Sequence, residues 1–370
     1  MRILIIVNEF PPDRVAGTAL STFHLAKHLT RRGHEVRVLV TERIKAPAED
    51  ILEGFQVRRL QRSAPKGLGW LLRLWFVWRE AKKFQPDILQ GQAVSCGLLA
   101  AVCGRLLGVP SITYAQGQDV YQAKPWQRLT EIRWGCLWPT AVLAVSNHLA
   151  GKIRDICRRK DIRVLPHGFE PPSHFPEGPF SKNELTKQVK RDKSAPIVLN
   201  VGRLEAIKGQ DILLSAWPSV LASRPEARLW LVGNGSKKED LKKQADLLGI
   251  TATVRFWGYL PQDRTAALLT EADLFVLPSR SEAFGIVLLE AMARGIPVVA
   301  SNVKGVAEVV PPSGEAYLVP PEDVSSLGDS IVLGLSDFKK PAVANRLWAM
   351  SFTWERIVLR FENVYEALCR

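Results

Sequence analysis

Two glutamates eight positions apart, Glu282 and Glu290, form the pattern with the clearest chemistry in this chain. The segment 278–291 that carries them predicts a strand end, a loop and a helix start. On one continuous helix the carboxylates would lie about 80° and roughly 12 Å apart, too far for a catalytic pair. With Glu282 in the loop and Glu290 one to two turns inside the helix, they would lie on either side of a phosphate-binding helix N-terminus. Each could then hold sugar hydroxyls. The plainer interpretation of Glu290 is a helix carboxylate paired with an arginine.

Two cations, Arg203 and Lys208, stand near the start of the C-terminal half. Gly202 and Arg203 directly follow a predicted strand, and Lys208 with Gly209 opens the next helix. At a strand's carboxyl edge, an arginine acts as a two-pronged donor and a lysine as a point charge toward a diphosphate. Taken alone, such a pair is more often simply solvated.

Short β-like runs alternate with helical patterns along nearly the whole chain, which is typical of βαβ units and parallel sheets. The predicted strands are 3–7, 36–41, 87–91, 111–114, 141–145 and 163–166, then 197–201, 229–232, 254–257, 274–277 and 298–300. We therefore expect an α/β fold of two doubly wound parallel-sheet (Rossmann-like) domains facing a cleft, where such folds bind ligands.

The expected domain boundaries follow from length and composition. A chain of 370 residues suits two domains, and prolines, a glycine and a charged run interrupt the alternation at 171–196. We expect an N-terminal domain at 1–175, a linker at 176–195 and a C-terminal domain at 196–350. A helix over 351–370 would then pack back toward the N-terminal domain.

Common nucleotide-binding motifs are missing from the sequence. The stretch 9–17 after the first strand contains no GxGxxG, and no GxxxxGK[ST] loop occurs in the chain. These absences count against a dinucleotide-dependent dehydrogenase, which would share the architecture.

At this point the sequence resembles a known family, the retaining glycosyltransferases of family 4, which have the GT-B fold. The resemblance rests on the Glu282-x7-Glu290 spacing with Phe284-Gly285 inside it, the pairs Gly202-Arg203 and Lys208-Gly209, Gly233-Asn234-Gly235 and Pro297-Val298-Val299. It implies that the N-terminal domain binds the acceptor and the C-terminal domain binds a nucleotide sugar, such as a UDP- or GDP-sugar, as substrate. It implies no other cofactor.

The resemblance also assigns roles to residues. Arg203 and Lys208 would bind the donor diphosphate, Glu290 the ribose, and Glu282 with the Phe284-Gly285 backbone the transferred sugar. The residues expected to bind the donor are Gly17, Gly202, Arg203, Lys208, Gly258, Glu282, Phe284, Gly285, Ile286 and Glu290, of which Arg203, Lys208 and Glu282 are the catalytic candidates. Gln116 and Asp119 would position the acceptor or the sugar, and 255–258 would lie near the base.

Several positions depart from the family pattern. Ala16-Gly17 replaces two adjacent glycines, His167 stands where asparagine is frequent, and Gly305-Val306 stands where two glycines are frequent. Gln116 replaces a histidine that would contact the sugar. Because glutamine does not titrate at useful pH, this position suits positioning better than acid-base chemistry.

The reaction implied is hexosyl transfer with retention of anomeric configuration, by same-face attack. A donor phosphate oxygen would take the acceptor proton. No DxD-like cluster marks a metal site, so we expect no metal, with cations stabilising the leaving group. Two rivals remain open: a GT-B sugar-nucleotide epimerase, and a basic nucleic-acid-binding protein, against which the lack of a recognisable binding motif counts.

The net charge of +13 is unevenly distributed. Residues 1–190 hold 29 Lys and Arg against 16 Asp and Glu, whereas residues 191–370 hold 21 of each. The segments 66–84 and 124–138 interleave tryptophans with basic residues, a combination that suits an anionic bilayer surface. We therefore expect a lipid-linked or cell-surface glycan acceptor and no nucleic acid partner.

The expected location is the cytoplasm, with peripheral association at the inner face of the cell membrane. No signal peptide or membrane-spanning segment is recognisable in the sequence. The five cysteines are widely spaced and form no disulfide or zinc pattern.

Overall fold

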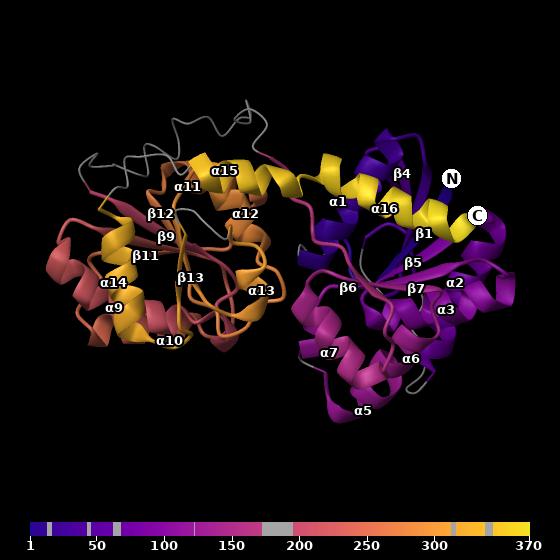
Figure 1. The fold of residues 1–370 in the computed structure, drawn as a ribbon, viewed down its shortest axis with the longest axis horizontal. Helices are drawn as coiled ribbons and strands as arrows, with labels where there is room; N and C mark the ends of the chain where they lie inside the picture. The colour runs from indigo at the N-terminus through magenta and orange to yellow at the C-terminus, as the bar shows by residue number, and fades with distance from the viewer. Residues whose placement is uncertain are drawn as a thin grey trace. The chain divides into compact units, whose positions relative to one another are not determined.

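Two α/β units, each with its own largely parallel β-sheet, make up the computed structural model (Figure 1). The first unit comprises Met1–Gly168 with Thr353–Arg370, and the second comprises Phe169–Phe352. The structure describes residues 1–12, 17–42, 46–61, 68–121, 123–171, 195–311, 316–336 and 343–370, without the side chains of 118, 119, 127–129 and 316. The predicted linker, 176–195, lies outside the described residues except for Ala195.

The first unit contains an eight-stranded sheet of order β3-β4-β2-β1-β5-β6-β7-β8, parallel except between β3 and β4. Its strands are β1 (Arg2–Val7), β2 (Glu35–Val40), β3 (Glu49–Leu52), β4 (Phe55–Arg59), β5 (Ile88–Gln92), β6 (Ser111–Ala115), β7 (Ala141–Ala144) and β8 (Ile162–Val164). Its helices are α1 (Gly17–Arg31), α2 (Gly69–Phe84), α3 (Val94–Leu107), α4 (Gln118–Tyr121), α5 (Pro125–Gln127), α6 (Arg133–Leu137), α7 (Asn147–Cys157) and α16 (Trp354–Cys369), with a π-helical turn, η1 (Arg128–Ile132).

The C-terminal helix α16 belongs to the first unit. Trp354 at its start is 1% exposed and stacks near His24 and His28 of α1, with ring centroids 6.3 and 6.4 Å away. Farther along α16, Glu362 accepts hydrogen bonds from Arg32 at 2.6 Å, and its carboxylate lies 2.8 Å from the His34 ring. Helix α16 therefore belongs to the layer of helices that packs on the sheet of the first unit.

The second unit contains a six-stranded parallel sheet of order β11-β10-β9-β12-β13-β14. Its strands are β9 (Ile197–Val201), β10 (Arg228–Val232), β11 (Val254–Gly258), β12 (Leu274–Leu277), β13 (Val298–Ser301) and β14 (Ala316–Val319). Its helices are α9 (Gln210–Ser223), α10 (Lys238–Leu247), α11 (Gln262–Glu271), α12 (Ile286–Met292), α13 (Lys304–Ala307), α14 (Val324–Gly334) and α15 (Val343–Ala349), with 3₁₀ turns η2 (Ala206–Lys208) and η3 (Met350–Phe352).

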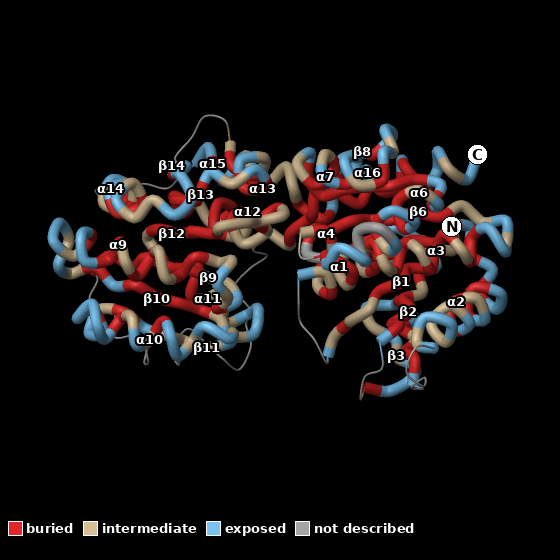
Figure 2. The backbone as a smooth tube through the Cα atoms, turned by 90° about the horizontal axis from the view of Figure 1, so that it is seen from below, coloured by how far each residue is buried: buried red, intermediate tan, exposed pale blue. Residues whose placement is uncertain are grey.

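The strands of both sheets are largely buried (Figure 2). Helices cover both faces of a parallel sheet, so its strands read as almost continuous apolar runs. In both units the strand order reverses beside the first strand, between β1 and β5 and between β9 and β12. Doubly wound sheets bind ligands outside the carboxyl ends of the strands at such a switch point. The predicted architecture of two doubly wound units is confirmed.

Candidate active site

The loops that follow β9 and β12 meet at the switch point of the second sheet. Arg280 N donates to the Ile207 carbonyl at 2.9 Å, which joins the two loops through their backbones. Gly209 has a φ of +67°, and a Cβ there would lie 2.0 Å from the Pro278 carbonyl oxygen. Only glycine fits this approach, which places the η2 turn directly against the end of β12.

Lys208 and Glu282 form an ion pair across these two loops. Lys208 Nζ donates to Glu282 Oε2 at 2.5 Å, and the two side chains are 19% and 15% exposed. The sequence predicted a role for both residues but not this contact. A half-buried ammonium beside a carboxylate offers a charged, hydrogen-bonding surface at the carboxyl edge of the sheet.

Arg280 holds this arrangement together, and sequence reasoning missed it. Its guanidinium donates to both carboxylate oxygens of Asp211, at 2.8 and 2.7 Å, and to the Ala206 carbonyl at 2.5 Å. It also donates to Glu322 at 2.9 Å. The hydrogen bonds that Arg280 donates to the Asp211 carboxylate keep the pKa of Arg280 above its usual value. Arg280 thus ties the turn that carries Lys208 to the loop that carries Glu282.

Arg203 extends from the loop after β9 with an exposed side chain. Its carbonyl accepts a bond from the buried Gln210 Nε2 at 3.2 Å, and Leu204 N donates to the Asn234 carbonyl at 3.0 Å. A Cβ on Gly233 would lie 1.9 Å from the Gly202 carbonyl oxygen. The backbone around Arg203 is therefore fixed on both sides while its guanidinium faces solvent.

Gly258 ends β11 beside these loops. It has a φ of +70°, and its carbonyl accepts from Gly233 N at 2.8 Å. In the same strand, the Arg255 guanidinium lies 3.7 Å from the centre of the Trp257 ring. The segment expected near the base therefore ends at the same sheet edge as Gly202.

Helix α12 begins at Ile286, immediately after Gly285, whose φ is +90°. Glu282 lies in the preceding loop and Glu290 in the second turn, as the spacing predicted. Burial raises the pKa of Glu290, and the charge of Arg294 offsets part of this effect. Arg294 also donates to the Glu290 carbonyl at 2.6 Å.

Phe284 is 3% exposed, and its ring packs edge-on against Phe352 at a centroid distance of 6.0 Å. A Cβ on Gly305 of α13 would lie 2.1 Å from the Glu282 carbonyl oxygen. The loop that carries Glu282 is therefore held from two sides. Among the described residues, no hydrogen bond or ion pair links the Arg203 or Glu290 side chains to the Lys208–Glu282 pair.

The expected residues of the first unit lie near the carboxyl edge of its sheet. Gly17 begins α1, while 13–16 of the expected loop lie outside the described residues. Asp119 belongs to the short helix α4, and its side chain is outside the description. Gln116 follows β6, is 7% exposed, and donates to Gln92 Oε1.

His167 lies buried beneath the same sheet edge. Its Nδ1 lies 2.9 Å from Ser21 Oγ and 3.3 Å from the Tyr114 hydroxyl. Burial lowers the pKa of His167 to about 3, so the ring is neutral at physiological pH. Through its contacts with Ser21 and Tyr114, His167 links α1 to β6.

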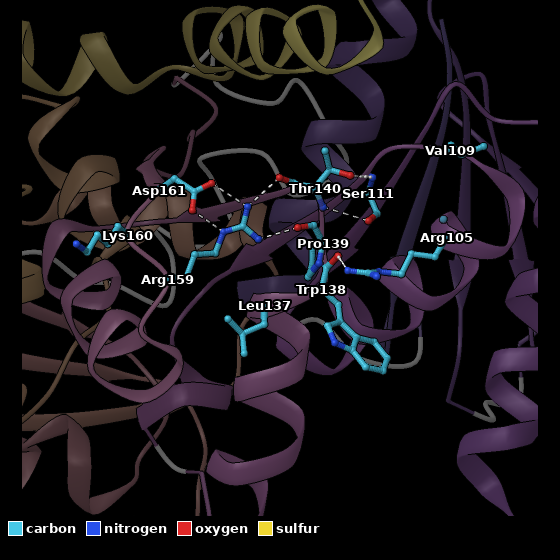
Figure 3. A pocket seen from close by; sticks show the side chains of 11 residues that line it. Arg105, Val109, Ser111, Leu137, Trp138, Pro139, Thr140, Arg159, Lys160 and Asp161 are labelled. Carbon is cyan, nitrogen blue, oxygen red and sulfur yellow. Dashed lines mark hydrogen bonds and ion pairs between the residues drawn. The ribbon is translucent and has the colours of Figure 1, made fainter.

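A surface pocket of about 540 Å³ lies elsewhere in the first unit, at the amino ends of β6, β7 and β8 (Figure 3). Arg159 lines it, and its guanidinium is occupied by the Pro139 and Thr140 carbonyls at 2.6 and 2.8 Å and by Asp161 at 2.8 Å. The pocket is therefore at the opposite sheet edge from every predicted site residue of this unit.

Within the described part of the chain, no three histidine, cysteine, aspartate or glutamate side chains gather in a way that could hold a metal ion. No described helix is long and apolar enough to cross a bilayer.

Two family models match the chain in succession. The model for Glycosyltransferase Family 4 matches residues 15–171, and the model for Glycosyl transferases group 1 matches residues 181–345. The two matches together include the loops that follow β5, β9 and β12.

Individual glycosyltransferases are also similar to this chain. An uncharacterized glycosyltransferase of Methanocaldococcus jannaschii is 26% identical, over 99% of this chain and 98% of that protein. A GDP-mannose-dependent monoacylated alpha-(1-6)-phosphatidylinositol monomannoside mannosyltransferase of Corynebacterium glutamicum is 31% identical over 55% of each chain. The structure of HepE from Anabaena in complex with UDP and glucose has a TM-score of 0.80 at 19% identity, covering 99% of both chains. The predicted GT-B fold is confirmed.

Proposed function

Because the chain belongs to glycosyltransferase family 4, we propose that it transfers a hexose from a nucleotide-diphosphate sugar, with retention, to a hydroxyl of a lipid-linked or cell-surface glycan precursor. The observation that carries the proposal is the Lys208–Glu282 pair at the second sheet's switch point, with Arg203 on the same loop as Lys208. This arrangement supplies cations for a diphosphate and a carboxylate for sugar hydroxyls.

The chemical step breaks the anomeric C–O bond to the diphosphate. Negative charge then develops on the leaving diphosphate, and Lys208 and Arg203 stabilise it. Helix α12 is only seven residues long, so we assign this stabilisation mainly to the two cations. Glu290 holds the ribose, and Glu282 orients the sugar. The acceptor oxygen attacks the same face that the diphosphate leaves, and a phosphate oxygen takes its proton.

No metal takes part in this proposal, because the two cations fill the role that a divalent ion would have. Turnover should therefore persist when EDTA is present. A strict requirement for an added divalent ion would contradict the metal-free mechanism.

A surface on the first unit supports a lipid-linked acceptor. Helices α2, α3 and α6 lie side by side in contact (Figure 1). Exposed apolar residues of these helices, with Trp138 directly after α6, define what we call the aromatic surface: Trp70, Leu71, Trp75, Leu106, Trp134 and Trp138, each 38% to 65% exposed. The core-facing stripe of α2 is made by other residues, including Phe76, Val77 and Phe84.

Basic side chains are interleaved with these rings. Arg79 lies 5.0 Å over Trp75, Arg105 lies 5.6 Å over Trp138, and Arg133 lies 5.8 Å over Trp134. Tryptophans settle at headgroup depth and cations attract anionic lipid. The mannosyltransferase relative is itself named for a phosphatidylinositol mannoside substrate, which also supports an acceptor at a membrane.

The test is a thermal-shift panel of UDP-, GDP- and ADP-sugars. A ligand at 100 times its Kd stabilises a protein by about 2.7 kcal/mol, so one series should raise Tm clearly. With that donor, nucleoside diphosphate should appear only when a lipid acceptor is supplied. Release without any acceptor would instead favour an epimerase, and a panel that shifts nothing would overturn the proposal.

A further inference from the structure

Two buried amides meet at the carboxyl ends of neighbouring strands in the first unit. Gln92 is the last residue of β5 and is 0% exposed, and Gln116 directly follows β6 and is 7% exposed. The strands pair in parallel, with Gln92 opposite Tyr114. Gln116 Nε2 donates to Gln92 Oε1, so the two side chains form one hydrogen-bonded unit.

This unit has unused hydrogen-bonding capacity. Gln92 Nε2 and Gln116 Oε1 are both buried, and neither has a partner among the residues that the structure describes. Leaving a buried donor or acceptor unpaired is costly, so such groups normally have a partner. Exchanging oxygen and nitrogen in both amides leaves the same remainder, one donor group and one acceptor.

The backbone beside Gln92 is strained. Ala93 has φ 102° and ψ 160°, a region that is almost restricted to glycine. Two bonds hold it there: Ala93 N donates to the Tyr114 carbonyl at 3.0 Å, and Gly97 N donates to the Ala93 carbonyl at 2.9 Å. Strain of this kind accumulates at ligand-binding positions, where it fixes the direction of a neighbouring side chain.

Gln90, in the same strand, also has a buried Nε2 without a partner among the described residues, but its oxygen is bonded away from the sheet edge. It lies two residues before the strand's end, and its Oε1 accepts a bond from Tyr365 of α16 at 2.6 Å. Its oxygen is therefore used in attaching the C-terminal helix. Gln92, at the sheet edge, has its oxygen bonded to Gln116 instead.

We propose that Gln92 and Gln116 act together to bind one hydroxyl group of a sugar. A hydroxyl both donates and accepts, which matches one free amide donor and one free amide acceptor. The inference rests on the proposed glycosyl transfer and adds Gln92 as a specificity-determining residue. Neither amide titrates at useful pH, so the unit positions the sugar and moves no proton.

The experiment compares Gln92→Leu and Gln116→Leu by calorimetry with UDP-glucose, GDP-mannose, ADP-glucose and the parent diphosphates. We expect each variant to lose about tenfold or more in affinity for the sugar nucleotide that the wild-type protein binds, with the diphosphate affinity unchanged. Because the residues act as one unit, the double variant should lose little more than either single variant. If the hydroxyl belongs to the acceptor, the same factor should appear in the acceptor KM instead.

Gln90→Leu is the matched control, since it removes a buried glutamine from the same strand and should leave both substrate affinities unchanged. Circular dichroism verifies folding, and Gln92→Glu retains the shape if Gln92→Leu fails to fold. Folded variants whose donor affinity and acceptor KM stay within twofold of wild type would overturn the inference alone. A wild-type protein that binds no sugar nucleotide would overturn the proposed function as well.

Discussion

Lys208 Nζ lies 2.5 Å from Glu282 Oε2 and joins two loops that are 74 residues apart in sequence. The pair is half-buried, so water screens it less than a surface ion pair. In the absence of donor, the carboxylate compensates the ammonium. A diphosphate bound beside Lys208 would share this cation with Glu282, which would place the proposed sugar-binding carboxylate next to the leaving group.

Removing either cation proposed to bind the donor should slow the chemical step. In Arg203→Ala and Lys208→Ala we expect kcat to fall about 100- to 1000-fold, the usual cost of losing one electrostatic donor to a developing negative charge. The acceptor KM should change little. Steady-state kinetics with the donor found in the thermal-shift panel measures both. Near-normal turnover in both variants would remove the pair from the mechanism.

Arg280 should act as a positioning residue for Lys208. Arg280→Lys loses the two-pronged contact with Asp211, which loosens the η2 turn, so we expect kcat to fall by about tenfold or more while the protein stays folded. Glu322→Gln is the matched control, because it removes an exposed partner of the same arginine worth about 0–1 kcal/mol. Equal turnover in the two variants would show that the Arg280–Asp211 contact does not position Lys208.

The sequence predicted the strands, loops and helices in which the candidate donor-site residues lie. Arg203 and Lys208 after β9, and Glu282 and Glu290 around the start of α12, belong to continuous strand-loop-helix patterns. The spacing of these residues was therefore enough to predict their positions, without any information about contacts between distant segments.

Contacts between distant segments could not be predicted from the sequence. The position of the Arg280 side chain depends on its contact with Asp211, 69 residues earlier. In the sequence Gln92 resembles any other strand residue, and only the pairing of β5 with β6 brings Gln116 beside it. The β3–β4 hairpin was also missed, although Glu53-Gly54, with φ of 47° and 89°, is a two-residue turn that could have signalled it.

Glu290 should contribute to binding the nucleotide portion of the donor. In Glu290→Ala we expect affinity for the parent nucleoside diphosphate to fall by about tenfold or more, because a charge-assisted hydrogen bond to a ribose hydroxyl is lost. Calorimetry on the folded variant measures this. Unchanged diphosphate affinity would leave Glu290 as a helix residue that only interacts with Arg294.

His167 should make stability sensitive to acid. Its folded pKa is about 3 and its unfolded value about 6.5, so below pH 6.5 only the unfolded chain gains a proton there. The free energy of unfolding should therefore fall as the pH drops from 6.5 toward 3. His167→Asn should lose less stability over this window in urea titrations, with pH 8 as the reference for the substitution's structural cost. Parallel pH profiles would contradict the assignment.

The aromatic surface of the first unit should dock on anionic bilayers. Each nearby Lys or Arg contributes about 1 kcal/mol at such a surface, and salt screens it, so the protein should co-sediment with anionic liposomes at low salt, less at high salt, and poorly with neutral liposomes. Trp70→Ser with Trp75→Ser should weaken binding, because rings at headgroup depth are lost. Leu247→Ser is the control: Leu247 is 88% exposed on α10, in the second unit. Wild-type protein that stays in the supernatant with anionic liposomes at low salt would make a soluble acceptor the better hypothesis.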